Sequence, residues 1–271
     1  MGADVESQPS PQPAAPVEPV WSLWIALGMF AFWMALNLTI PQTSLMISLA
    51  LHRIDASQWE SEAQKLVDMP WTAFVMLLCT LLCWIITFGV LDSWFRRFPR
   101  ELVRKALAVR IPRPRWSLVA AALIGVGVYF AALAIQNVSP DTDVGPFEDL
   151  LKSTVGKVSL TLLAVGLAPF AEEIFFRGFL YPPMLAVASK IPGGSRGRSI
   201  AIACFANALL FTIAHTLDYG LDFASLAGVM LLGLAAALLR AWSGSVWPGI
   251  VGHLFFNGTA LVIAFAFGGS P

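Results

Sequence analysis

Six residues in the second half of the chain have the types and spacings that hydrolytic chemistry requires. They are Glu172, Glu173, Arg177, His215, His253 and Asn257. All six stand in apolar stretches, where a charged side chain costs about 2.5 kcal/mol or more and is usually retained for a function. Hydrolysis of a peptide needs a base that activates water and hydrogen-bond donors placed where negative charge develops. A carboxylate, imidazoles and an amide can together supply both.

Helical spacing separates the roles of the two acids. Glu173 and Arg177 are four residues apart, so we expect them to form an ion pair along one helix face. Glu172 lies ~100° further round the helix and is less well placed to reach Arg177. We therefore predict that Glu173 and Arg177 neutralise each other as structural residues, and that Glu172 is the free general base.

The other candidates come from two further helices. His253 and Asn257 are four residues apart and share a helix face, and Phe211 lies one turn before His215 as its structural neighbour. Neutral His253 and the Asn257 amide can both donate hydrogen bonds. At 1.5 Å per residue from the predicted inner helix ends, Glu172 lies ~13 Å deep, His253 ~10 Å and His215 ~24 Å. The cluster therefore requires a longer fourth span, a later start of the fifth span, or tilted helices.

The composition is typical of an integral membrane protein with an all-α fold. Hydrophobic residues make up 57% of the 271 residues and charged residues 13%, against roughly 25% charged in soluble domains. At about 20 residues per span, the chain has room for a bundle of roughly seven transmembrane helices with the site inside it. The predicted spans are 21–40, 70–91, 116–137, 158–181, 199–217, 222–239 and 246–267. Pro41 is expected to break the first helix and leave 44–51 as a separate half-segment, which would raise the count to eight.

These spans divide the chain into four parts. Residues 1–20 are rich in proline without a basic residue, and we expect a disordered tail. Residues 21–91 hold two N-terminal transmembrane helices, with a short amphipathic helix predicted near residues 57–67. Residues 92–115 form a basic cytoplasmic loop, and residues 116–271 form a five-span bundle. Within this bundle, small residues at 121, 125, 127 and 131 predict close helix contacts.

Charge is divided unequally between the two ends of the predicted bundle. Loops 92–115, 181–198 and 240–245 hold 12 of the 17 basic residues and two acids, whereas loops 41–69, 138–157 and 218–222 hold four basic residues and ten acids. Because basic residues favour cytoplasmic loops, we predict a cytoplasmic N-terminus and an external C-terminus in the plasma (inner) membrane. The basic loop would also meet membrane lipid, and the net charge of zero argues against nucleic acid as a partner.

Three motifs in order resemble those of a known family. Glu172-Glu173-x-x-x-Arg177, Phe211-x-x-x-His215 and His253-x-x-x-Asn257 are similar to the motifs of the CPBP (CAAX protease and bacteriocin-processing) family, the intramembrane glutamate proteases related to the type II CAAX prenyl endopeptidase. The resemblance covers about residues 158–262. It implies an endopeptidase in which Glu172 activates a water with the help of His215, while His253 and Asn257 stabilise the oxyanion. It also implies a peptide or protein substrate, and CAAX-type C-terminal processing would make that substrate prenylated.

Two alternatives compete with this interpretation. In the first, His215, His253 and Glu172 hold a zinc ion in a membrane metalloprotease, although the sequence has no H-E-x-x-H motif. In the second, the protein is a catalytically silent membrane scaffold or an immunity-type protein. A transporter is disfavoured, because its polar residues would be spread along a path through several spans. Our expectation is a glutamate protease without a cofactor, and three cysteines, Cys79, Cys83 and Cys204, that are simply buried.

Overall fold

The structure is a computed structural model that describes residues 20–51, 58, 72–138 and 153–267. All regular elements among these residues are helical. They are α1 (Leu23–Leu51), α3 (Thr72–Phe95), α4 (Arg100–Ala106), α5 (Ser117–Asn137), α7 (Thr154–Thr161), η2 (Leu162–Leu167), α8 (Ala168–Glu173), η3 (Ile174–Leu180), α9 (Tyr181–Ala188), α10 (Arg196–Ala214), α11 (Thr216–Tyr219), α12 (Phe223–Ser243) and α13 (Trp247–Phe267). The tail and the amphipathic helix predicted near residues 57–67 lie outside the described residues, apart from residues 20 and 58.

Seven helices in the described part of the chain are long and apolar enough to cross a membrane. The predicted all-α transmembrane bundle is therefore confirmed. The prediction of a break at Pro41 was wrong, because α1 continues through this proline to Leu51. Apolar surroundings favour continued helix over exposed backbone, so a proline inside a membrane helix is tolerated when neighbouring groups compensate for the lost hydrogen bond.

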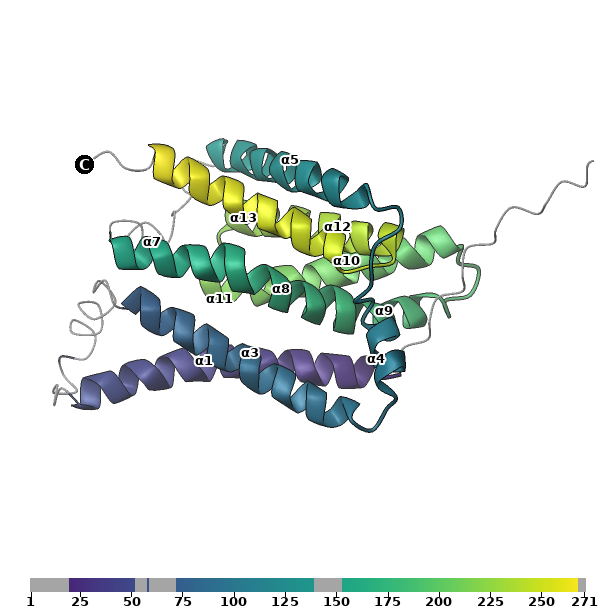
Figure 1. Ribbon diagram of the computed structural model, residues 1–271, viewed down its shortest axis with the longest axis horizontal. Coiled ribbons are helices and arrows are strands. Elements are labelled where there is room, and N and C mark those ends of the chain that lie inside the picture. Colours follow the sequence, from purple (N-terminus) through teal and green to yellow (C-terminus); the bar gives the residue numbers. More distant parts are fainter. Residues whose placement is uncertain (1–19, 52–57, 59–71, 139–152, 268–271) are drawn as a thin grey trace, which may run out of the picture.

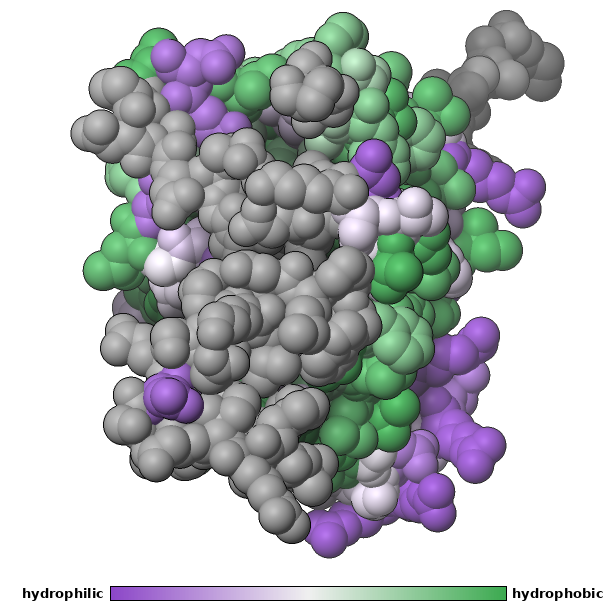
Figure 2. All heavy atoms as spheres, turned by 90° about the vertical axis from the view of Figure 1, so that its left-hand side faces the viewer, coloured by the Kyte–Doolittle hydropathy of each residue, from purple (hydrophilic) through white to green (hydrophobic). Residues whose placement is uncertain are grey.

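The spans run side by side, so that all the connections lie at the two ends of the bundle (Figure 1). α4, the end of α9 and the beginning of α1 lie at one end, and the chain's C-terminus lies at the other. Figure 2 looks at the C-terminal end, where hydrophobic residues reach the surface in broad areas beside the residues drawn in grey. Among the described residues, the basic loops therefore gather at the end opposite the C-terminus.

The basic segment 92–115 is more ordered than a simple loop. α3 extends into it as far as Phe95, and α4 forms a short helix within it. Its later part folds under the turn between α12 and α13, where the Val246 amide donates to Ala108 O (3.2 Å). Val246 and Ala108 are both buried, so the turn that leads into α13 lies inside the bundle, while Trp247, the first residue of α13, is 38% exposed.

Small residues bring α5 against α13. Only some of the small residues that the sequence analysis named take part in this contact. A Cβ atom added to Gly125 would overlap the carbonyl group of Gly252, and a Cβ added to Gly252 would lie 3.2 Å from Ala121 O. Gly127, in contrast, is exposed with open space around it. The close helix contact therefore uses the Ala121 and Gly125 face, and the predicted contact through Gly127 was wrong.

The fourth span, Thr154–Ala188, is an irregular helix in which α7, α8 and α9 alternate with the π-helical segments η2 and η3. Each π-helical segment is followed at once by proline: Pro169 after η2, and Pro182 and Pro183 after η3. Proline has no N–H to donate, and its ring clashes with the carbonyl four residues earlier. These prolines therefore explain why the span widens locally instead of continuing as an α-helix.

Side chains from other parts of the chain bind the backbone carbonyls of η3. The three hydrogen bonds are Asn207 Nδ2 to Phe176 O (2.9 Å), Arg240 Nε to Arg177 O (3.2 Å) and Trp21 Nε1 to Phe179 O (2.9 Å). Carbonyls in a bilayer cannot be hydrated, so bonds of this kind are needed wherever the regular helical pattern fails. The irregular span is thus fixed by α10, α12 and the residue just before α1.

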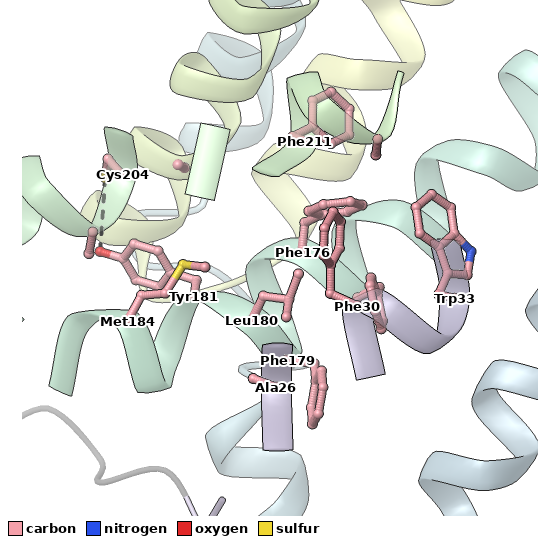
Figure 3. Close-up of a cluster of buried hydrophobic side chains, with 14 of the residues drawn as sticks. Ala26, Phe30, Trp33, Phe176, Phe179, Leu180, Tyr181, Met184, Cys204 and Phe211 are labelled. Atoms are coloured by element: carbon pink, nitrogen blue, oxygen red, sulfur yellow. Dashed lines mark hydrogen bonds between the residues drawn. The ribbon is translucent and has the colours of Figure 1, made fainter. Parts of the chain in front are cut away.

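The two N-terminal helices add an aromatic layer against the same segment (Figure 3). Phe30 and Trp33 of α1 contact Phe176 of η3, with ring centroids 6.1 and 6.0 Å apart. Trp84 of α3 packs on Trp33 at 5.0 Å. Edge-to-face and tilted ring pairs of this type stabilise a core beyond the area that they bury. α1 and α3 therefore hold the outer side of η3.

We predict that Gly125→Ala destabilises the bundle, because the new methyl group overlaps the Gly252 backbone and forces α5 away from α13. Overpacking of this kind typically costs ~1–3 kcal/mol. The measurement is thermal unfolding of the purified protein in detergent. Gly127→Ala is the matched control on the same helix and should keep the wild-type Tm or raise it slightly. Equal Tm values for the two variants would contradict the α5–α13 packing.

Candidate active site

Three of the predicted catalytic side chains meet within the bundle. Glu172 of α8 lies with its Oε2 atom 3.9 Å from His215 Nε2 and 4.0 Å from His253 Nε2. His215 directly follows α10, and His253 lies in the second turn of α13. Glu172 Oε2 is buried and has no hydrogen-bond partner among the described residues. The site thus places a carboxylate oxygen opposite two imidazoles from different spans.

The depth difference expected for His215 disappears because the fourth span is longer than predicted. Its helix continues through Pro182 and Pro183 to Ala188, which lengthens the inner part of the span below Glu172. His253 reaches the same level from only six residues into α13, because the turn that leads into α13 lies inside the bundle. The two changes together bring Glu172, His215 and His253 to one level.

The hydrogen bonds of the two histidines assign their tautomers. His215 Nδ1 lies 2.8 Å from Phe211 O, and a carbonyl oxygen only accepts, so Nδ1 carries the proton. His253 Nδ1 lies 3.2 Å from Glu173 Oε1, an oxygen that also accepts from Arg177. An ionised carboxylate is likewise only an acceptor. In both neutral imidazoles the Nε2 lone pair is therefore directed at Glu172.

The pair Glu173 and Arg177 is present as the spacing predicted, with Arg177 Nη1 2.9 Å from Glu173 Oε1 and both side chains 0% exposed. Arg177 Nη2 also donates to Gly233 O (3.0 Å) of α12. The guanidinium carbon of Arg177 lies 4.3 Å from the ring centroid of Phe211, a favourable cation–π distance. The pair therefore connects three spans instead of being a purely local device.

Glu173 has a second role that the sequence did not reveal, because it holds His253. Oε1 of Glu173 accepts from both Arg177 and His253, while Oε2 lies where a Cβ on Gly249 would come within 2.6 Å. Gly249 is one turn before His253 on the same helix. A larger residue at this position would displace the carboxylate that orients the imidazole. Only the position of α13, which the sequence does not give, makes this contact visible.

Asn257 and Phe211 complete the set of predicted residues. Asn257 Nδ2 donates to Ala164 O (2.6 Å) in η2, so one amide hydrogen binds the backbone of the fourth span. Phe211 is fully buried and packs on His215 at 4.5 Å and on His253 at 5.8 Å between ring centroids. Phe211 therefore packs against both imidazoles.

Two further residues near the site were missed. Asn207 lies one turn before Phe211 on α10 and binds Phe176 O, and a single amide within this apolar run was the signal for it. Tyr219 stacks nearly parallel on His215, with 6.4 Å between ring centroids. Tyr219 was missed because it lies beyond the predicted end of the fifth span. Both residues restrain elements that carry site side chains.

The zinc alternative needs donor atoms of Glu172, His215 and His253 to converge on one point. Tetrahedral ligation at ~2.0–2.2 Å needs three or four donor atoms converging on one point. Among the described residues, no group of three or more His, Cys, Asp and Glu side chains could hold a metal ion. The three cysteines are buried and not in disulfides, as predicted from their apolar surroundings.

A protein-family model matches the part of the chain that contains the candidate site. Residues 154–259 match the family described as Type II CAAX prenyl endopeptidase Rce1-like. The matched residues begin at α7, end within α13 and include all three motifs. They coincide closely with the part that resembled this family by its motifs alone. Neither the search of curated proteins nor the search of solved structures returned a match.

We predict that Glu173→Gln destabilises the protein strongly, because it leaves the Arg177 charge buried without its partner. Breaking a buried ion pair from one side typically costs ~3–5 kcal/mol. The exposed pair Asp92 and Arg96, joined at 2.9 Å with the same spacing, provides the control. Asp92→Asn should cost less than about 1 kcal/mol. Thermal unfolding in detergent compares the two, and similar small losses would show that the buried pair does not stabilise the fold.

Proposed function

We propose that this protein, of which residues 154–259 match the Rce1-like family of type II CAAX prenyl endopeptidases, hydrolyses a peptide bond near the membrane by attack of a water that Glu172 activates. The observation that carries this proposal is the convergence of one carboxylate oxygen and two imidazole nitrogens from three spans. Glu172 Oε2 faces His215 Nε2 at 3.9 Å and His253 Nε2 at 4.0 Å. Glu172 Oε2 and His215 Nε2 are two acceptors without a donor between them, and a water molecule has two hydrogens to give.

In the proposed reaction, the water donates one hydrogen bond to Glu172 and a second to His215. As its oxygen attacks the carbonyl carbon of the scissile bond, the proton passes to the Glu172 carboxylate. The carbonyl oxygen becomes an oxyanion, and collapse of the tetrahedral intermediate breaks the C–N bond. Glu172 then returns the proton to the leaving amine nitrogen, so the site ends as it began.

His253 and Asn257 are the proposed oxyanion donors, with one change from the sequence-based view. Neutral His253 has its only hydrogen on Nδ1, where Glu173 accepts it, so its Nε2 cannot donate. Donation from His253 Nε2 to the oxyanion therefore requires a hydrogen on that nitrogen as well. Asn257 keeps one amide hydrogen beyond the bond to Ala164 O. Glu173 is thus a positioning residue in this mechanism, and Glu172 the catalytic one.

We further propose CAAX-type C-terminal processing, with a prenylated peptide or protein as the substrate class. The family match supports this class. The competing candidate is a silent scaffold or immunity-type protein, which would keep the fold without using Glu172. The basic end of the bundle is proposed to face the cytoplasm of a plasma (inner) membrane, because positively charged connections favour that side. A reporter fused after residue 271 should then be protease-accessible only from outside the cell.

We predict that Glu172→Gln abolishes proteolysis, because an amide cannot accept the proton of the attacking water. Loss of a general base lowers the rate by at least ~100-fold. The measurement is mass spectrometry of membrane peptides from cells that contain the wild-type or the variant protein. Wild-type cells should contain cleaved C-termini that are missing with Glu172→Gln. Identical peptide profiles, together with full complementation of a deletion strain by the variant, would favour the scaffold.

Two controls sharpen this experiment. Glu101→Gln makes the same chemical change at an exposed carboxylate of α4, whose pKa is lowered by the hydrogen bond and the charge of Arg104. This variant should cleave like the wild type. Treatment of the purified protein with a strong chelator tests the zinc alternative, because a glutamate mechanism predicts unchanged activity. Loss of activity that added zinc restores would instead support the metalloprotease.

A further inference from the structure

Two arginines outside the candidate active site lie together at the basic end of the bundle. Arg240 is in the last turn of α12 and is only partly exposed. Its Nε donates to Arg177 O (3.2 Å), and its guanidinium carbon lies 5.6 Å from the ring centroid of Tyr181. These two contacts fix the guanidinium plane while leaving its two Nη groups without a hydrogen bond to the described residues.

Arg110 is held in a similar way from the basic segment. Its Nε donates to Gly244 O (2.8 Å), and its Nη2 lies close against Gly244, where a Cβ would come within 2.6 Å. The backbone that carries it is fixed as well, because Ser245 Oγ donates to Arg110 O. Two residues earlier, Ala108 has a φ of 55°, a strained value for a residue with a side chain. Such strain persists where the surrounding contacts define one conformation.

Neither arginine has a compensating negative charge in the part of the chain that the structure describes. The ion pairs there involve Arg96, Arg104, Lys105, Arg177, His215 and His253 as the basic partners. Arg110 and Arg240 both contact Gly244, because Arg110 Nε donates to Gly244 O and the Gly244 amide donates to Arg240 O. Two arginines that are held at the same turn, without a carboxylate partner among the described residues, favour a bound anion.

The level of the pair along the bundle indicates which anion is available. Trp242, two residues beyond Arg240, is 47% exposed and forms an edge-to-face pair with Trp116, which is 61% exposed, at 4.9 Å between ring centroids. Exposed tryptophans of membrane proteins concentrate at the level of the lipid headgroups. Arg240 is therefore within one helical turn of the layer that contains lipid phosphates.

We propose that Arg110 and Arg240 together bind a phosphate group, supplied by the headgroup of an anionic phospholipid. Guanidinium groups match phosphate oxygens with paired N–H donors, and each arginine here has its Nη groups available. The anchoring of both side chains through Nε orients these donors before the ligand arrives. The site is separate from Glu172, and the proposal does not depend on the protein being a protease.

The test compares Arg110→Gln with Arg97→Gln, which removes the same charge from an exposed arginine of the same basic segment. Both variants leave the Arg240 anchor intact, and equal Tm values confirm that they fold alike. Phosphatidylglycerol binding to detergent-purified protein is measured by native mass spectrometry. Arg110→Gln should bind the lipid about tenfold more weakly than wild type, the effect of one charge-assisted hydrogen bond. Arg97→Gln should bind it within about twofold of wild type, as expected for a distant exposed charge.

A second arm uses inorganic phosphate to identify the source of the ligand. Competition between millimolar phosphate and the lipid in wild type, but not in Arg110→Gln, would support a site for the phosphate group itself. Phosphate binding that depends on Arg110, with unchanged lipid binding, would assign the site to free phosphate and overturn the lipid source. Equal lipid and phosphate binding by both variants would overturn the site altogether.

Discussion

Backbone carbonyls cannot be left without donors inside a lipid bilayer, and the architecture of this protein depends on how its fourth span meets that constraint. Pro169, Pro182 and Pro183 remove three amide donors from this span, and η2 and η3 widen it locally. Donors from α10, α12, α13 and the start of α1 bind carbonyls of the two π-helical segments. Glu172 and Glu173 stand between η2 and η3, so the backbone that carries them is held by most of the bundle.

The same constraint governs the charges. Arg177 and Glu173 are both fully buried, and each has partners on another span: Gly233 O for the guanidinium and His253 for the carboxylate. Further hydrogen bonds offset part of the cost of burying a charged pair, although Glu173 Oε2 and Arg177 Nε have no partner among the described residues. Here one of those bonds also decides which nitrogen of His253 faces Glu172. The same Glu173 oxygen accepts from Arg177 and from His253, so a change in the buried ion pair would also change the orientation of the imidazole.

The sequence predicted those features that depend on periodicity within one helix. The ion pair between Glu173 and Arg177, the apolar spans and the close-packing face at Gly125 all follow from side-chain spacing along a regular helix. Prediction from the sequence failed where a helix becomes irregular or where the contacting residue lies far away in the chain. Pro41 left α1 continuous, while Pro182 follows a π-helical segment. Local sequence does not distinguish the two, because the outcome depends on which donors neighbouring spans supply.

The contact between His253 and Glu173 shows most clearly what could not be predicted from the sequence. Its two residues are 80 positions apart, and it exists because the turn that leads into α13 lies inside the bundle under the folded basic segment. Sequence-based depth counting assumes that every span begins at the membrane surface, which is why it placed His215 and His253 at different levels. Nothing in the periodicity of α13 indicates that the turn before it is buried. Its small residues Gly249 and Gly252 are consistent with close approach but do not identify the partner.

The N-terminal helices lie outside the residues that match the family, yet they complete the support of the span that carries Glu172 and Glu173. Pro183 removes the α-helical donor for Phe179 O, and Trp21 Nε1 supplies a replacement from 158 residues earlier in the chain. Trp33 and Phe30 pack on Phe176 in the same segment. Because η3 carries Arg177, which orients Glu173, a shift of α1 would reach the site through a short series of packed groups. The matched region therefore contains the candidate chemistry, but its geometry is a property of the longer chain.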